Sequence, residues 1–250
     1  MTRLDDVFDD YAFACLYDHF NPWMACDDFY LSLAQKAGGP VLDLGCGTGM
    51  LACRIAQDVQ PVTGADPANG MLRVARSRPG SERVTWTHCG GQNLILKDRF
   101  KLAYMTGHAF QAVITDDEVF ALLTTVRKHL APSGHFAFET RNPAAHAWKA
   151  WVLATPGEVA EVPGYGQVEE AFDTTYDPAT GIAEIRHIHR FLDTGREQTG
   201  TSRIRWITPD HLDRLLTAAG LEVKTRYGDW DGSAFQADNR EIISVVGVTE

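Results

Sequence analysis

An apolar run that ends in a glycine-rich turn is the feature that most constrains this chain. Residues 41–49 read VLDLGCGTG, and a helix-like apolar stretch with Met50, Leu51 and Ile55 follows. The pattern is typical of a buried parallel strand, a tight turn and a helix. Glycines let the backbone approach a ligand, and the helix N-terminus offers free N–H groups. We therefore expect the first strand–turn–helix unit of a doubly wound α/β sheet, with a nucleotide-like ligand lying across it.

The spacing of the glycines separates two classes of ligand. Gly45, Gly47 and Gly49 form G-x-G-x-G, whereas the dinucleotide fingerprint is G-x-G-x-x-G. Two acids accompany them, because Asp43 precedes the first glycine and Asp66 ends the expected second strand about twenty residues later. An acid at the end of that strand suits the binding of ribose hydroxyls, although it can also cap the next helix. The spacing speaks against a nicotinamide cofactor.

Residues 41–49 closely resemble motif I of the class I S-adenosylmethionine (SAM) dependent methyltransferases, and residues 64–72 (GADPANGML) resemble their second motif. This resemblance implies that Asp43 meets the methionine part of SAM and that the glycines pass beneath it. It also implies that Asp66 holds the ribose, and that the residues just after Asp66, with Met71, border the adenine. The structural alternative is an ordinary glycine-rich turn in another α/β protein.

Two segments depart from the usual pattern of that family. After the expected third strand (84–88), residues 90–94 read GGQNL and lack the family's usual acid, so an amide side chain or the backbone would hold the adenine. Lys101 stands where the fourth strand usually carries an acid. The residues expected to hold SAM are Tyr17, Asp43, Gly45, Cys46, Gly47, Gly49, Asp66, Pro67, Met71, Gly91, Gln92 and Met105, with Cys46 interpreted as a small side chain that the turn requires.

The loops that follow the fourth and fifth strands should face the methyl acceptor, because ligands of open α/β sheets bind beyond the carboxyl ends of the strands. His108 is the nominee for acid–base catalysis, since histidine titrates near neutral pH. Each candidate has a structural alternative: a satisfied histidine, loop-closing hydrogen bonds, or a packed aromatic ring. The expected acceptor-binding residues are Tyr11, His108, Arg141, Asn142 and Trp230, of which His108 is the catalytic one.

The pattern of the remaining chain predicts three parts. Residues 1–39 read as an N-terminal helical lid, and residues 40–164 with 208–250 as the SAM-binding core. This core is expected to hold a seven-stranded, mostly parallel sheet whose last strand is antiparallel. Residues 165–207 alternate apolar and polar side chains, which predicts an antiparallel β-meander of three strands. In the methyltransferases that this chain resembles, similar β insertions cover the substrate or pair two subunits, so the resemblance implies that a homodimer is possible.

The composition of the chain limits which partners, compartment and metal are expected. The net charge is −10 and the 23 basic residues form no block, which disfavours nucleic acid. No stretch approaches the ~20 apolar residues of a membrane span, and the acidic N-terminus lacks a secretory signal core. The 5 cysteines form no C-x-x-C pair, which favours the reducing cytoplasm. His187 and His189 share a face of an expected strand, but without a third ligand no metal is expected.

These patterns predict a SAM-dependent methyltransferase that acts on an N or O atom of a small-molecule acceptor. Such a reaction depends mainly on holding donor and acceptor close and aligned. A second hypothesis is a SAM-binding regulatory or assembly protein without turnover, motivated by the missing adenine-side acid and by Lys101. A third is another Rossmann enzyme that uses NAD.

Overall fold

The computed structural model describes residues 6–59, 61–150 and 157–249. Its centre is a seven-stranded sheet with the order β10-β11-β5-β4-β1-β2-β3. Only β11 runs antiparallel to its neighbours, so the expected doubly wound sheet with an antiparallel last strand is confirmed. The strands are β1 (Val41–Leu44), β2 (Val62–Asp66), β3 (Val84–His88), β4 (Phe100–Met105), β5 (Leu130–Arg141), β10 (Leu221–Tyr227) and β11 (Glu241–Val248).

Helices cover both faces of this sheet. On one face α3 (Ala25–Ala37) and α4 (Met50–Asp58) bury Tyr30, Ile55 and their neighbours against the strands. On the other face α6 (Asp116–His129) and α7 (Pro209–Ala218) pack on Phe136 and Phe138 of β5. All four strand residues of β1 are buried, as a parallel strand covered on both faces requires. The remaining elements of the core are α5 (Asn69–Ser77) and the 3₁₀ turns η1 (Ser81–Arg83), η2 (Gly91–Asn93), η3 (Ala109–Ala112), η4 (Pro143–Ala145) and η5 (Ala147–Ala150).

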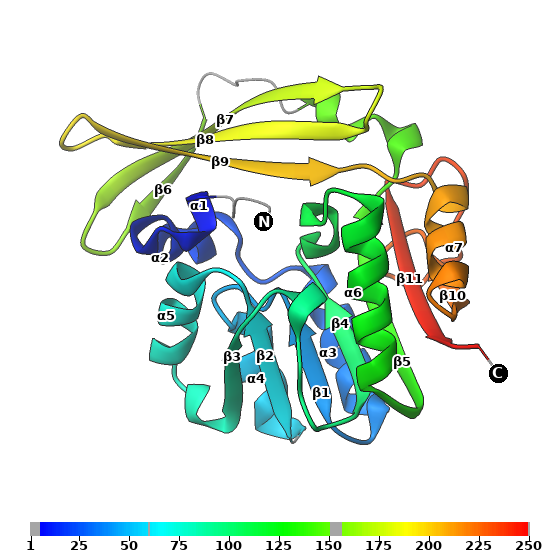
Figure 1. The fold of residues 1–250 in the computed structure, drawn as a ribbon. Coiled ribbons are helices and arrows are strands. Elements are labelled where there is room, and N and C mark those ends of the chain that lie inside the picture. The colour runs from blue at the N-terminus through cyan, green and yellow to red at the C-terminus, as the bar shows by residue number, and fades with distance from the viewer. Residues whose placement is uncertain (1–5, 60, 151–156, 250) are drawn as a thin grey trace.

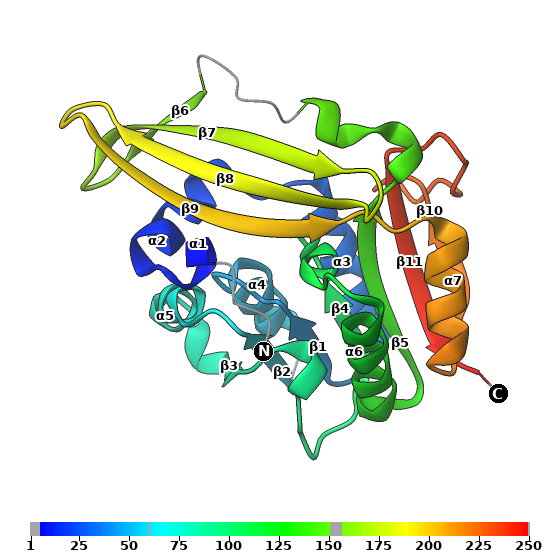
Figure 2. The same ribbon diagram turned by 45° about the horizontal axis from the view of Figure 1, so that its top comes forward.

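A second sheet, here called the roof sheet, spans residues 158–205 and arches over the carboxyl edge of the first (Figures 1 and 2). It is antiparallel and has four strands: β6 (Glu158–Val162), β7 (Gly166–Asp177), β8 (Ile182–Phe191) and β9 (Arg196–Arg205). The expected three strands are therefore one too few. The missing strand, β6, reads EVAEV and buries only Val162, so its sequence carries little apolar signal.

Two short N-terminal helices lie between the two sheets. α1 (Asp6–Asp9) contacts β9 and α5, and α2 (Tyr11–Phe20) contacts α5 and β6. The Asp10 carboxylate caps α2 by accepting from the N–H groups of Ala12 and Phe13. α3 packs instead on α4 and β4 of the central sheet, so α1 and α2 are the parts of the expected 1–39 lid that reach the carboxyl edge. Within the described residues, every helix is too short or too polar to cross a bilayer.

Candidate active site

The glycine turn between β1 and α4 has the backbone geometry that only glycine adopts easily. Gly47 has φ of 52°, and a Cβ on it would point into open space. Gly49 has φ of 73°, and a Cβ there would stand 2.5 Å from the Trp86 ring, so its side is closed by packing. The Gly45 N–H donates to the carbonyl of Ala65 on β2 at 2.8 Å, which ties the turn to the neighbouring strand. The turn is therefore held against β2 and Trp86, and it is open to a ligand at Gly47.

Asp43 is a buried carboxyl group directly beneath this turn. It is 1% exposed, and its Oδ1 accepts no hydrogen bond of normal geometry from the described residues. Burial raises the pKa of Asp43 to about 8, against the opposing effect of the Tyr104 hydroxyl. A buried acid without a partner is costly unless a ligand completes its hydrogen bonds. An incoming ammonium group, such as that of the methionine part of SAM, fits this vacancy in the hydrogen-bond network.

Asp66 ties the glycine turn to the start of α5. One carboxylate oxygen accepts from the Gly47 N–H at 2.8 Å and the other from the Ala68 N–H at 2.8 Å. Burial raises its pKa to about 6. Each carboxylate oxygen has two acceptor positions, so hydroxyl groups of a ribose can still bind. Asp66 therefore accepts from the backbone at the start of α5, as the capping alternative predicts, and it can still bind a ribose.

The remaining cofactor candidates line the same edge of the sheet. Met71 and Met105 are buried, and η2 places Gly91 and Gln92 after β3 at this edge. Gly91 packs so tightly that a Cβ would stand 2.5 Å from Leu122. Burial raises the pKa of the Cys46 thiol well above its usual value, which fits a small packed side chain rather than a nucleophile.

Pro67 and Lys101 occupy opposite edges of the sheet. Pro67 follows Asp66 directly, and its carbonyl oxygen lies 2.8 Å from Nε2 of His88 at the end of β3. Lys101 lies at the start of β4, where its ammonium group donates to the carbonyl of Pro132 at 2.8 Å. Lys101, where the chain departs from the family pattern, therefore lies at the ends of the strands opposite the glycine turn.

A cavity of about 330 Å³ lies beside the glycine turn, between the η3 loop, α1–α2 and the underside of the roof sheet. It brings together four of the residues expected from the sequence: Tyr17, Met71, His108 and Arg141. Burial raises the pKa of Tyr17 to about 12, so this phenol stays protonated as a hydrogen-bond donor. The Arg141 guanidinium donates to Oε1 of Gln111 at 3.1 Å, and burial lowers its pKa.

Three expected acceptor residues do not line this cavity. Tyr11 is 39% exposed and packs under the guanidinium of Arg73, 3.8 Å from the ring centre. The Asn142 amide donates to the carbonyls of Ala237 and Asn239, so it closes a loop. Trp230 packs against aromatic rings of α3 on the other side of the sheet. In all three cases the structural alternative explains the position.

His108 is held from two sides at the mouth of the η3 loop. Its backbone N–H donates to Oε1 of Glu139 at 2.7 Å, and its Nε2 lies 2.9 Å from Oε2 of Glu241. The second oxygen of Glu139 accepts from the Tyr30 hydroxyl. Burial raises the pKa of Glu139, and its side chain is 0% exposed. Neither carboxylate was identified from the sequence, because both lie inside strands with no motif of their own.

The roof sheet supplies further cavity residues that the sequence did not single out. The Glu170 carboxylate of β7 accepts from Nε2 of His189 at 3.0 Å, and His187 pairs with the Ser202 hydroxyl at 2.8 Å. Phe13 and Phe20 of α2 lie against the His189 ring. The available signal was the alternation of His187 and His189, which placed both on one face.

The arginines of β8 lie on the opposite face of the roof sheet. Ile185, His187 and His189 point into the cavity, so the alternating Arg186 and Arg190 point outward. Arg190 pairs there with Glu169 and Glu197, which raises its pKa. Among the residues that the structure describes, no group of three or more His, Cys, Asp or Glu side chains has an arrangement suited to a metal.

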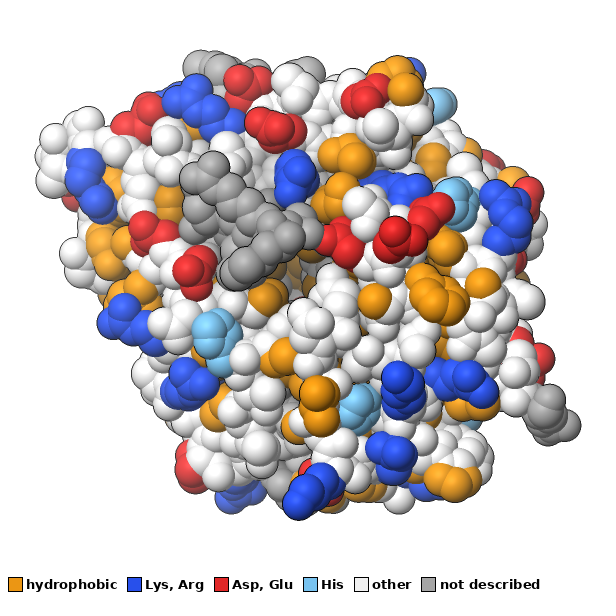
Figure 3. Space-filling model, in the orientation of Figure 1, with side chains coloured by type: hydrophobic (Ala, Val, Ile, Leu, Met, Phe, Trp, Pro, Cys, Tyr) orange, Lys and Arg blue, Asp and Glu red, His pale blue; other side chains and the backbone are white. Residues whose placement is uncertain are grey.

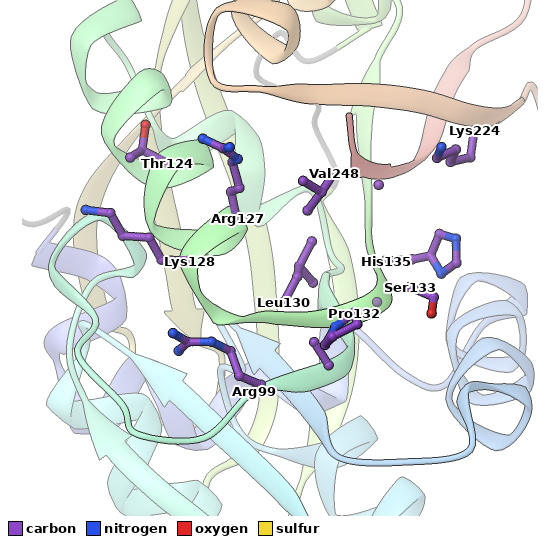
Figure 4. A pocket seen from close by; sticks show the side chains of 13 residues that line it. Arg99, Thr124, Arg127, Lys128, Leu130, Pro132, Ser133, His135, Lys224 and Val248 are labelled. Carbon is purple, nitrogen blue, oxygen red and sulfur yellow. The ribbon is translucent and has the colours of Figure 1, made fainter. Parts of the chain in front are cut away.

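A larger hollow, of about 860 Å³, lies at the far edge of the central sheet (Figure 4). It is formed where α6 ends, β5 begins and β11 ends, so the whole sheet separates it from the glycine turn. Arg99, Arg127 and Lys128 line it. In Figure 3 basic side chains gather at the lower right of the molecule, whereas acidic ones lie mainly on the upper half. Four residues expected from the sequence line the smaller cavity, and none of the expected residues lines this larger one.

Comparisons with known proteins agree with this geometry. Residues 41–134 match the family model of a methyltransferase domain. The chain is 24% identical over 211 residues to the cypemycin N-terminal methyltransferase of Streptomyces sp, covering 84% of this chain and 83% of that protein. It spans only 62% of the next curated relative, a ubiquinone biosynthesis O-methyltransferase of Dinoroseobacter shibae, with 26% identity.

Solved structures of methyltransferases share the whole architecture. The CcbJ methyltransferase from Streptomyces caelestis aligns over 98% of both chains with a TM-score of 0.78 and 24% identity. SAM-bound CalS10, an amino pentose methyltransferase from Micromonospora echinaspora, aligns over 95% of this chain and 97% of its own with a TM-score of 0.69 and 20% identity.

The fold and the glycine-turn site thus define a class I SAM-dependent methyltransferase. Over residues 41–134 the chain matches a methyltransferase domain, and SAM is its cofactor. The matches support the enzyme, and none supports a SAM-binding protein without turnover.

Proposed function

We propose that the chain transfers the methyl group of SAM to an amine nitrogen of a small-molecule acceptor bound in the 330 Å³ cavity. The observation that carries this proposal is the position of that cavity. Tyr17 and Met71, which are expected to hold SAM, line it together with His108 and Glu170. A volume of this size suits a small molecule rather than a polymer.

The polarity of the cavity favours an amine over a carboxylate. Glu170 contributes a carboxyl group from the roof sheet, and the rings of Phe8, Phe13 and Phe172 add aromatic surface around it. Carboxylates and aromatic faces together attract cations. Arg141 is the opposing charge, but Glu139 and Glu241 face its guanidinium and offset it. The N-methyltransferases among the similar structures add support for nitrogen.

The residues of the chain contribute positioning and one proton acceptor. SAM, when bound, supplies an electrophilic methyl carbon; the acceptor lone pair forms the new bond to it as the carbon–sulfur bond breaks. Asp43, Asp66 and the glycine turn would hold SAM so that its methyl group faces the cavity. An amine that is protonated in water must lose a proton before it can attack, and His108 would accept that proton.

Turnover with a panel of acceptors tests this function. The purified chain would be incubated with SAM and with matched amines, alcohols, phenols and carboxylates, and S-adenosylhomocysteine would be measured. We expect turnover with amines and none with carboxylates. Turnover confined to hydroxyl compounds would show that the acceptor atom is oxygen and that the proposed nitrogen acceptor is wrong. SAM binding by calorimetry without turnover on any acceptor would support the non-catalytic alternative instead.

The His108→Ala variant tests the proton acceptor. We expect kcat to fall by roughly 100-fold, while the SAM dissociation constant stays within about twofold, because His108 lies on the acceptor side. His135→Ala is a suitable control, since this histidine lines the larger hollow at the far end of the central sheet. An unchanged kcat in the His108 variant would remove this residue as the base.

Partners and compartment follow from the same surface properties. We propose that the acceptor is not a nucleic acid, because the net charge of −10 repels phosphate chains. The five cysteines are all free thiols, which fits the reducing cytoplasm. A homodimer through the roof sheet stays a proposal that light scattering would test.

A further inference from the structure

Three acidic and basic residues of neighbouring strands gather around His108. β5 and β11 pair antiparallel, with Arg141 opposite Glu241 and Glu139 opposite Ile243. Residues that pair directly, and those two positions along, share one face of a sheet. Glu139, Arg141 and Glu241 therefore form a charged group on one face at the carboxyl end of β5, directly under the η3 loop.

Glu139 fixes the backbone of the loop. Gly107 and His108 have consecutive φ values of 64° and 61°, in the left-handed region. A side chain in that region costs about 1 kcal/mol or more, and it persists only where its surroundings hold it. The hydrogen bond of 2.7 Å from the His108 N–H to the buried Glu139 carboxylate is such a constraint, and Tyr30 holds that carboxylate in turn.

Glu241 fixes the ring. Its Oε2 lies 2.9 Å from Nε2 of His108, and both side chains are largely buried, at 19% and 18% exposed. A carboxylate only accepts hydrogen bonds, so the proton of the neutral ring lies on Nε2. The lone pair of the neutral ring is then on Nδ1. Because His108 lines the cavity, Nδ1 is the nitrogen that can take a proton from a bound acceptor.

We propose that Glu241 is a positioning residue for methyl transfer, acting through His108. Its carboxylate keeps the proton of the neutral ring on Nε2 and stabilises the positive charge after Nδ1 accepts a proton. In that step the N–H bond of the protonated acceptor breaks, its electron pair stays on the acceptor nitrogen, and an N–H bond forms at Nδ1. This inference rests on the proposed function, since it needs His108 as the proton acceptor.

Other titratable or charged groups lie near His108 and Glu241 and interact with them electrostatically. They come from β5, α2, α3 and the roof sheet, and they are Glu139, Arg141, Tyr17, Tyr30, Glu170 and His189. Glu241 also acts on Arg141 and Glu139, so the double variant with His108 is needed to separate its effect on the ring from its effect on these two groups.

Kinetics of Glu241→Gln and His108→Ala, singly and combined, test the coupling. Glutamine keeps the shape and a hydrogen-bond acceptor but removes the negative charge. We expect kcat to fall at least tenfold in Glu241→Gln with KM for SAM unchanged, and the acidic limb of the pH–rate profile to move to lower pH. The double variant should lose no more than His108→Ala alone, because both act through one ring. Glu222→Gln on the exposed end of β10 is the matched control.

A spectroscopic readout separates this inference from the proposed function. In ¹⁵N-histidine spectra of the enzyme without SAM, the His108 signals, assigned with the His108→Ala variant, should show the proton on Nε2. Glu241→Ala should shift the ring toward a mixture of both tautomers, and Glu241→Asp should restore part of the parent pattern. If the parent turns over and His108→Ala is impaired, but Glu241→Gln matches the parent in kcat, profile and tautomer, the inference is wrong and the function stands. If no acceptor is turned over, the function fails, and the tautomer still decides whether Glu241 sets the ring.

Discussion

At the scale of single residues, the cofactor side of the site is dominated by a carboxyl group that the protein alone does not satisfy. The folded chain holds the pKa of Asp43 at about 8, far above the ordinary value of 3.8. The folded state therefore binds this proton more tightly than the unfolded state does. Its contribution to stability is present below about pH 4 and is lost as the pH rises toward 8. A ligand that needs the ionised carboxylate has to displace the proton.

Asp43→Asn should separate binding from stability. The amide has no charge to bury, so we expect the variant without SAM to be more stable than the parent at pH 9, by roughly 1–3 kcal/mol. SAM binding should fall by at least tenfold at the same pH. Thermal unfolding across pH 5 to 9 and calorimetry measure the two effects. Asp58→Asn, whose carboxylate is on the surface beside Arg54, should show neither. A variant that binds SAM normally would contradict the placement of Asp43 at the cofactor.

At the scale of elements, α2 is fastened to the glycine turn by one acid. Asp18 accepts from the Thr48 hydroxyl at 2.6 Å and pairs with the Arg78 guanidinium, while Nε of Arg78 donates to the carbonyl of Thr48. These contacts link the lid helix, the start of α4 and the segment after α5. No sequence motif predicts these contacts, because they join three segments that are distant in the chain.

Asp18→Ala should loosen this link. A half-exposed ion pair of this kind contributes about 1 kcal/mol, so the fold should survive. We expect faster hydrogen exchange over residues 11–20 and a SAM dissociation rate raised several-fold, because the helix that covers the turn opens more often. Hydrogen-exchange mass spectrometry and stopped-flow release of SAM measure the change. Asp28→Ala, at the start of α3, removes an exposed acid that does not contact the glycine turn and should leave both quantities unchanged.

The elements of the central sheet were largely predictable from the sequence, whereas many of the residues that line the cavity were not. β1, β2 and their helices follow from apolar runs and glycine turns, which are local signals. Trp230 and Asn142 were assigned to the acceptor because polar and aromatic loop residues often bind ligands, but each satisfies its own loop or core. Glu139 and Glu241 were missed because their role depends on the pairing of β5 with β11, which are about a hundred residues apart, and periodicity does not encode such a pairing. Glu170 pairs with the nearby His189, but its place in the cavity depends on how the roof sheet lies over the central sheet.

At the scale of the whole molecule, the proposed function assigns SAM binding to the central sheet and acceptor binding to the cavity under the roof sheet. The central sheet carries the glycine turn, and the roof sheet carries the far wall of the cavity. Changes in the roof sheet should therefore alter the acceptor and leave SAM binding alone.

Ile185→Ala tests that division. The isoleucine lines the cavity and is 7% exposed, so the change removes apolar contact worth about 2 kcal/mol. We expect KM for the acceptor to rise roughly tenfold while the SAM dissociation constant stays the same. Arg186→Ala is the adjacent control on the outward face, and it should affect neither. Equal losses in both variants would argue that the roof sheet acts only through stability.

The connection of the roof sheet to the rest of the chain has an evolutionary consequence. Strands β6–β9 form one continuous excursion that leaves after β5 and returns before α7, and both of those elements belong to the central sheet. A substitution, insertion or exchange within residues 158–205 leaves the sequence of the glycine turn untouched. Under the proposed function, substitutions in the roof sheet can change which molecule is methylated during evolution, while the residues that hold SAM stay the same.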